Sequence, residues 1–222
     1  MNDTKTLNQA ALQRARDRLV DALQAKGVTN PLVLEALRAV PRHLFVEDAL
    51  QYRAYEDSAL PIGQAQTISQ PYIVGVMTQA LFSSTRPMNS VLEIGTGCGY
   101  QTAVLAELAK RVCTVERIRS LQQPSEQRLR SLGYRNIEYR HGDGFVGWRE
   151  RGPFDGIMVT AAASEIPKML VDQLDIGGRM VLPLGEDGGH QQLCLLRKTG
   201  NGTVEENLLP VRFVPLLRGV EA

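Results

Sequence analysis

The spacing of apolar residues predicts two helices at the start of the chain. Between residues 7 and 25, apolar side chains recur at helical spacing with charged residues between them, and Gly27 ends the pattern. Asn30 and Pro31 then supply a cap and a first-turn proline for a second helix, which Pro41 stops. The pattern is too short for a coiled coil, so it predicts an N-terminal helical extension.

The next stretch shows no clear period. Residues 41–66 contain Pro61 and Gly63 and are expected to be irregular. Residues 71–82 predict a helix begun by a proline, and residues 83–90 (SSTRPMNS) predict a turn-rich connection.

From residue 91 onward, short apolar runs alternate with amphipathic segments. The predicted strands lie at 91–95, 111–116, within 136–144, at 155–160 and at 177–185, with helices at 101–110, 118–132 and 166–174. Pro124 is expected to delay the start of the helix over 118–132. Residues 191–198 and 211–217 predict an antiparallel pair around the turn at 198–203.

This alternation predicts the α/β class, with a doubly wound, mostly parallel, Rossmann-like sheet. We expect one domain over residues 1–222, in which residues 1–60 form the helical cap and residues 61–222 form the α/β core.

Composition narrows the function classes. The net charge is +1, which disfavours a large nucleic-acid footprint, and the longest apolar run, residues 156–163, is too short to span a bilayer. The three cysteines and three histidines are scattered singly, without disulfide or metal-ligand spacing. The polar N-terminus does not resemble a signal peptide, so we expect a cytoplasmic protein without a metal, a membrane or a nucleic-acid partner.

The most informative motif is VLEIGTGCGY at residues 91–100. Gly95, Gly97 and Gly99, with Thr96 between the first two, follow a predicted strand and precede a helix. Glycine lets the backbone bend tightly and approach a ligand. The dinucleotide fingerprint is GxGxxG, whereas here the spacing is GxGxG and Tyr100 takes the place of the last glycine.

Acidic residues stand beside this turn and at the ends of the following strands. Glu93 precedes the first glycine by two positions, and the resulting ExGxGxG pattern resembles the first motif of S-adenosylmethionine methyltransferases. Glu93 could complement a cationic ligand, directly or through water. Glu116 could accept hydrogen bonds from both ribose hydroxyls of NAD or S-adenosylmethionine, and Asp143, beside Gly144, could accept one from an adenine amino group. Singly, each motif could be ordinary turn chemistry, but together they indicate a nucleoside cofactor.

Residues 66–72 (QTISQPY) place Thr67 and Ser69 around Ile68, with no histidine, lysine or cysteine nearby. A carboxylate acceptor is already ionised and needs no general base, only neutral donors that orient it. These hydroxyls suit that task. Alternatively, Ser69 could cap the helix over 71–82.

Together these segments resemble the protein-L-isoaspartate O-methyltransferase family. The resemblance runs from about residue 32 to the C-terminus and rests on the segments 40–46, 59–81, 91–108, 142–148, 153–163, 166–185 and 212–216. It implies a methyltransferase sheet with a rearranged strand order. It also implies methyl transfer from S-adenosylmethionine to the α-carboxylate of L-isoaspartyl residues in damaged proteins, followed by succinimide closure and partial return to aspartate.

The resemblance also implies roles for individual residues. Ser69 is the active-site hydroxyl, and Thr67 and Ile68 share its substrate loop. The cofactor is held by the turn and by the strand-end residues, namely Glu93, Gly95, Thr96, Gly97, Gly99, Tyr100, Glu116, Asp143 and Gly144. The segment 212–216 (RFVPL) helps to close over the substrate.

One departure from the family pattern is Ala65, where glycine is usual before QTIS; a positive φ there would cost roughly 1 kcal/mol. An NAD-dependent oxidoreductase, another methyltransferase acting on small molecules, and a nucleoside-binding module without chemistry remain open alternatives. We expect a monomer.

Overall fold

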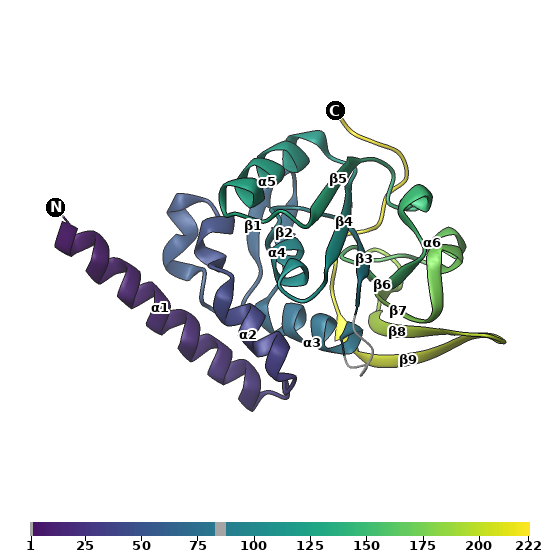
Figure 1. Cartoon of the computed structure of the whole chain (residues 1–222), viewed down its shortest axis with the longest axis horizontal. Coiled ribbons are helices and arrows are strands. Elements are labelled where there is room, and N and C mark those ends of the chain that lie inside the picture. Colours follow the sequence, from purple (N-terminus) through teal and green to yellow (C-terminus); the bar gives the residue numbers. More distant parts are fainter. Residues whose placement is uncertain (1, 83–87) are drawn as a thin grey trace.

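The computed structural model describes residues 2–82 and 88–222, and these residues contain a seven-stranded sheet and a two-stranded hairpin. The strands are β1 (Leu60–Gly63), β2 (Gln66–Ile68), β3 (Ser90–Ile94), β4 (Arg111–Glu116), β5 (Ile137–His141), β6 (Phe154–Val159), β7 (Leu174–Leu184), β8 (Gln191–Thr199) and β9 (Gly202–Val211). The helices are α1 (Asn2–Ala25), α2 (Pro31–Ala39), α3 (Pro71–Leu81), α4 (Tyr100–Ala106), α5 (Arg119–Ser131) and α6 (Lys168–Gln173), with short 3-10 helices at Arg42–Phe45, Asp48–Arg53 and Arg149–Arg151. Figure 1 shows their arrangement. The predicted turn-rich connection lies mostly outside the described residues.

The order of strands in the large sheet is β5-β4-β3-β6-β7-β8-β9. The pairs from β5 to β7 are parallel, and β8 and β9 add to the edge as an antiparallel hairpin. The predicted α/β class and the mostly parallel sheet are therefore confirmed. From β3 the chain winds first toward β5 and later toward β9, so the order reverses between β3 and β6, where open sheets of this kind bind ligands.

Both faces of the sheet are buried, which explains its nearly continuous apolar runs. Successive residues of β3 alternate between two hydrophobic clusters: Val91 belongs to the first and Leu92 to the second. The first cluster also contains residues of α3, α4 and α5, and the second contains residues of α6. The helices therefore form a layer on each side of the sheet.

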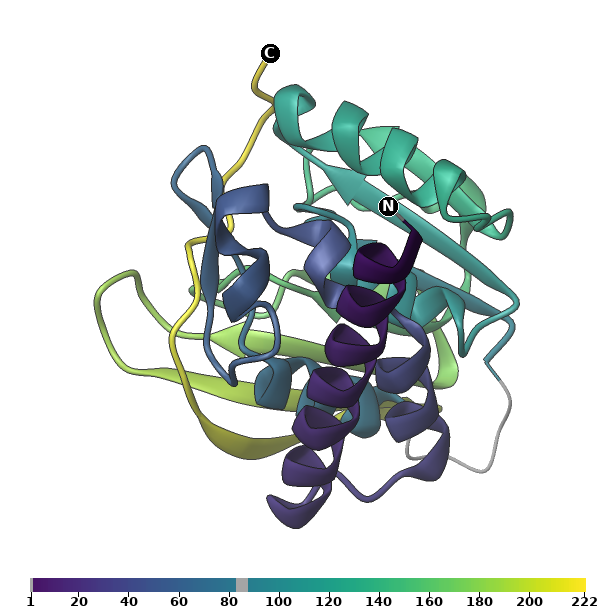
Figure 2. The same cartoon turned by 90° about the vertical axis from the view of Figure 1, so that its left-hand side faces the viewer.

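The N-terminal helices pack at one end of the molecule, as Figure 2 shows from that end. The predicted cap at Asn30 is present, because its side chain accepts from the N–H groups of Leu32 and Val33 at 3.0 and 3.4 Å. Gly75 of α3 lets the helical layer approach closely, since a Cβ there would lie 3.0 Å from a methyl of Val28. The division of the chain at residue 60 stays a prediction.

The expectation of irregular chain over residues 41–66 was wrong for its last part. Strands β1 and β2 form an antiparallel hairpin around Gln64 and Ala65, which have φ values of 52° and 54°. Such left-handed two-residue turns usually carry Asn-Gly or Asp-Gly, and this one does not, so no local signal announced it.

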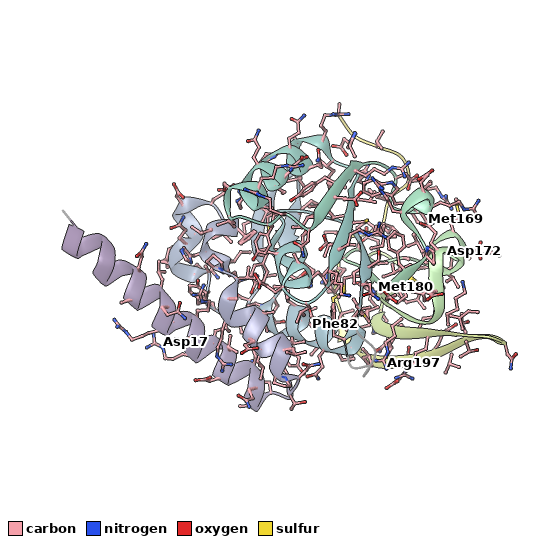
Figure 3. The ribbon with its side chains drawn as sticks, in the orientation of Figure 1. Asp17, Phe82, Met169, Asp172, Met180 and Arg197 are labelled. Carbon is pink, nitrogen blue, oxygen red and sulfur yellow. The ribbon has the colours of Figure 1, made fainter. Side chains whose placement is uncertain are left out.

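Two further expectations need correction. Pro124 does not delay its helix, because α5 begins at Arg119 and includes the proline. The carbonyl that loses its donor belongs to Ser120, which is exposed and can be solvated. The strand paired with β8 is β9, so residues 212–217 lie beyond the hairpin rather than in it. In Figure 3, Arg197 lies on this projecting hairpin, where it pairs with Glu206 at 2.7 Å, and Met180 lies in the sheet.

Candidate active site

The glycine turn after β3 adopts backbone angles that only glycine takes without strain. Gly95, Gly97 and Gly99 have φ values of 94°, 53° and 89°. A Cβ at Gly95 would collide with Oγ1 of Thr160, and one at Gly99 would lie 2.9 Å from Leu129. The Thr160 hydroxyl donates to the carbonyls of Ile94 and Gly95, at 2.9 and 2.8 Å, and so fixes the start of the turn.

Glu116 holds the same turn from the end of β4. Its Oε2 accepts from the N–H of Gly97 at 2.9 Å, and its Oε1 accepts from the N–H of Ile118 at 3.0 Å. The side chain is only 5% exposed but lines the cavity described below. A carboxylate has about four acceptor positions, so Glu116 keeps capacity for further donors.

Glu93 lies beneath the turn and not on the cavity surface. It is fully buried, and its Oε2 accepts from the hydroxyls of Thr102 and Thr114 at 2.5 and 2.7 Å. Because Thr114 donates to Glu93, Thr96, which lies 2.6 Å from it, donates to Thr114. Burial raises the pKa of Glu93 to about 8, so the carboxyl is largely protonated at neutral pH.

Tyr100 begins α4 and connects the turn to the segment before β1. Its ring lies edge-on to Phe45, and the guanidinium of Arg42 sits 4.9 Å from the ring centre. Arg42 is 1% exposed and donates to the carbonyls of Ala54 and Ser58, at 2.9 and 3.3 Å. The buried arginine therefore ties residues 54–58 to the start of α4, a role that the sequence pattern did not reveal.

Asp143 follows β5 and is engaged by the backbone. Its Oδ1 accepts from the N–H of Phe145 at 2.8 Å, and its Oδ2 accepts from the N–H of Gly219 at 2.7 Å. Gly144 lines the cavity, but Asp143 does not. A Cβ at Gly144 would lie 2.5 Å from Ile94, so glycine is required there for packing.

A cavity of about 530 Å³ opens where β3, β4 and β6 end. This volume is typical of sites for small molecules. Its floor includes the glycine turn, Tyr100 and Glu116, and one wall is the loop carrying Thr67, Ile68 and Ser69. The predicted cofactor turn and the predicted acceptor loop thus face one space.

Ser69 does not cap α3. The cap position is Gln70, whose side chain makes no capping bond, and the N–H of Tyr72 instead donates to Oδ1 of Asp57 at 2.8 Å. The capping interpretation of Ser69 was therefore wrong. Thr67 and Ser69 both line the cavity, and all the residues at 66–70, which line it together, have neutral side chains.

Residues 210–217, which we call the C-terminal segment, also line the cavity. The segment runs back across the ends of the strands, and in Figure 2 it is part of the yellow trace. Val214 and Leu216 exchange backbone hydrogen bonds with Ala162 at 2.8 and 2.7 Å. The sequence pointed to this segment but placed it in a strand.

The family model described as Protein-L-isoaspartate(D-aspartate) O-methyltransferase matches residues 14–221. The chain belongs to this family. The protein-L-isoaspartate O-methyltransferase of Ectopseudomonas mendocina is 55% identical over 207 residues, covering 93% of this chain and 97% of that protein. The corresponding protein of Pseudomonas aeruginosa PAO1 is 54% identical over the same shares.

Solved structures of proteins with the same family name have a similar fold. A protein-L-isoaspartate O-methyltransferase of Plasmodium falciparum, in complex with S-adenosyl-L-homocysteine, is similar with a TM-score of 0.79 and 26% identity, over 91% of this chain and 98% of that one. A second structure named protein-L-isoaspartate O-methyltransferase has a TM-score of 0.81 and 29% identity, over 90% of this chain and 65% of that one.

Metal sites and membrane-spanning helices were both looked for within residues 2–82 and 88–222. No group of three histidine, cysteine or acidic side chains there could hold a metal ion. None of the helices in this described part combines the length and the apolar character needed to cross a bilayer.

Proposed function

We propose that this protein transfers a methyl group from S-adenosylmethionine to the α-carboxylate of L-isoaspartyl residues in damaged proteins and peptides. Two findings support the proposal: the chain belongs to the family, and relatives that are more than 50% identical to it are named protein-L-isoaspartate O-methyltransferase. One structural observation carries it: Thr67 and Ser69 line the same cavity as the glycine turn and Glu116. We further propose that the protein works as a monomer in the cytoplasm, without a nucleic-acid partner.

The residues present fit this cofactor. When bound, S-adenosylmethionine supplies a methyl group on a positively charged sulfur. We assign its binding to the backbone of Gly95, Thr96 and Gly97, to Glu116 for the ribose hydroxyls, and to the space beside Gly144 for the adenine. All five of these residues line the same cavity, which supports this assignment.

Other predicted cofactor residues act through the walls of the site. Gly99 and Tyr100 set the beginning of α4, Glu93 holds Thr102 and Thr114 beneath the turn, and Asp143 fixes the backbone beyond β5. We assign them to shaping the cofactor pocket.

The acceptor needs orientation more than activation. An α-carboxylate has a pKa of about 3.5 and is ionised at neutral pH, so no general base is required. Thr67 and Ser69 can donate to one carboxylate oxygen and leave the other free to attack. Ile68 is 4% exposed and excludes water from this side. Neutral donors do not neutralise the nucleophile as an arginine or a lysine would.

The test is a matched pair of peptides that differ only in an isoaspartyl or an aspartyl linkage, incubated with methyl-labelled S-adenosylmethionine. We expect label only in the isoaspartyl peptide, as a base-labile ester. Equal labelling of both peptides, or of neither, contradicts the proposal. Binding of the cofactor without transfer would instead indicate a module that has lost the chemistry.

A further inference from the structure

The position of the C-terminal segment depends on a buried amide. Gln191 is the first residue of β8 and is 3% exposed. Its Oε1 accepts from the N–H of Phe213 at 2.7 Å, and its Nε2 donates to the carbonyl of Phe213 at 3.1 Å. A weaker bond of 3.4 Å joins Nε2 to the carbonyl of Glu186. Both ends of the amide therefore grip one residue of the segment.

The hydrogen bonds from Gln191 act on Phe213, in the middle of the segment. Phe213 lines the cavity that the acceptor loop also lines. Leu216 packs against the second cluster, with Ile94, and a Cβ at Gly144 would lie 3.3 Å from it. Leu216 therefore lies beside Gly144, in the part of the cavity that we assign to the adenine, and we assign Phe213 to the part that receives the acceptor.

Phe213 and Leu216 are also held by different hydrogen bonds. Val214 and Leu216 are secured by backbone hydrogen bonds to Ala162, and farther along Gly219 is secured by Asp143. Of Gln191, Ala162 and Asp143, only Gln191 makes hydrogen bonds to Phe213. A change at Gln191 therefore frees the backbone of Phe213, while the residues from Val214 onward keep their hydrogen bonds.

We propose that Gln191 is a positioning residue that fixes Phe213 and its neighbours as the acceptor wall of the site. It does not itself line the cavity, so it acts through the segment that it holds. This assignment rests on the proposed function, since it divides the cavity between an isoaspartyl acceptor and the cofactor.

Two variants test it. Gln191→Met keeps the length of the side chain but removes every hydrogen bond, whereas Gln191→Glu keeps an acceptor for the Phe213 N–H and removes the donor. The matched control is Gln192→Met, because the side chain of the next residue in a strand points to the other face. Peptide KM, kcat, calorimetric affinity for S-adenosylhomocysteine and amide hydrogen exchange are measured for each.

We expect both Gln191 variants to raise the peptide KM by roughly tenfold, the usual effect of leaving buried polar groups unpaired. The affinity for S-adenosylhomocysteine should change less than about twofold, and amide exchange should accelerate at Phe213 but not at Leu216. The ratio of the peptide KM of Gln191→Glu to that of the unmodified protein should fall as the pH is lowered, because a protonated carboxyl regains a donor. The Gln192→Met control should match the unmodified protein.

Three results would overturn the assignment: an unchanged peptide KM, an equal loss of cofactor affinity, or unfolding of both Gln191 variants at the assay temperature. Cofactor affinity and hydrogen exchange are measured without turnover. They therefore report on Gln191 even if the unmodified protein methylates no isoaspartyl peptide, an outcome that would reject the proposed function alone.

Discussion

The hairpin turn at Ala65 offers a quantitative test of backbone strain. Ala65 has φ of 54°, in the left-handed region, and its side chain is exposed. An L-residue in this region costs about 1–2 kcal/mol, which glycine does not. We therefore predict that Ala65→Gly stabilises the protein.

The size of the gain follows from two opposing effects. Relief of strain favours the variant, while the added freedom of glycine in the unfolded chain costs about 0.4–1 kcal/mol. The net gain is about 0.5–1 kcal/mol. For a chain of 222 residues this raises the thermal midpoint by about 1–4 °C.

The assay is denaturant unfolding with a parallel thermal scan, in the presence and absence of S-adenosylhomocysteine. Ala59→Gly is the control, because Ala59 is also exposed but is not among the residues with positive φ. It should lose stability through the unfolded-chain effect alone. If Ala65→Gly were equal to or less stable than the unmodified protein, the strain argument would be refuted.

Three further predictions concern residues around the site. The pKa of Glu93 is raised in the folded state from 4.5 to about 8, so its ionisation removes stability as the pH rises through that window; Glu93→Gln should therefore gain stability relative to the unmodified protein between pH 5 and pH 8, measured by denaturant unfolding, and a constant difference would contradict this. Ser69→Ala should lower kcat by about 10- to 100-fold with less than a twofold change in calorimetric affinity for S-adenosylhomocysteine, and the reverse pattern would exclude an acceptor role. Asp57→Ala should cost about 1 kcal/mol in thermal unfolding because it uncaps the N–H of Tyr72, whereas Lys26→Met, which removes the ion pair to Asp57 and a cation–π contact 5.9 Å from the ring centre of Tyr72 but leaves that N–H capped, should cost less.

Much of the fold could be predicted because the sheet is buried on both faces. Runs such as residues 91–94 and 112–115 are apolar at three of four positions, so each strand is recognisable by itself. The hairpin of β1 and β2 could not be found in this way. Its strands have four and three residues, and its turn at Gln64 and Ala65 lacks the glycine that normally identifies such turns.

The site was predictable where the residues stand at the carboxyl ends of parallel strands. Those ends meet at one edge, so the glycine turn and Glu116 were expected together, and the N–H of Gly97 donates to Glu116. The burial of Glu93 was not predictable, since it depends on Thr102 and Thr114 from two other elements. The hydrogen bonds between Gln191 and Phe213 could not be predicted either, because only the folded hairpin of β8 and β9 brings these two residues together.

The cavity also has halves of very different chain topology. The glycine turn, Glu116 and Gly144, which make up most of the cofactor half, come from one uninterrupted βαβαβ stretch, whereas Ser69 and Phe213 line the same cavity from positions that nearly the whole sheet separates in the sequence. Contacts of such high sequence separation form late, because a long loop must close before they contribute. On refolding, the nucleoside-binding half can therefore assemble first, and competence to engage a protein substrate arrives with the final crossing of the chain.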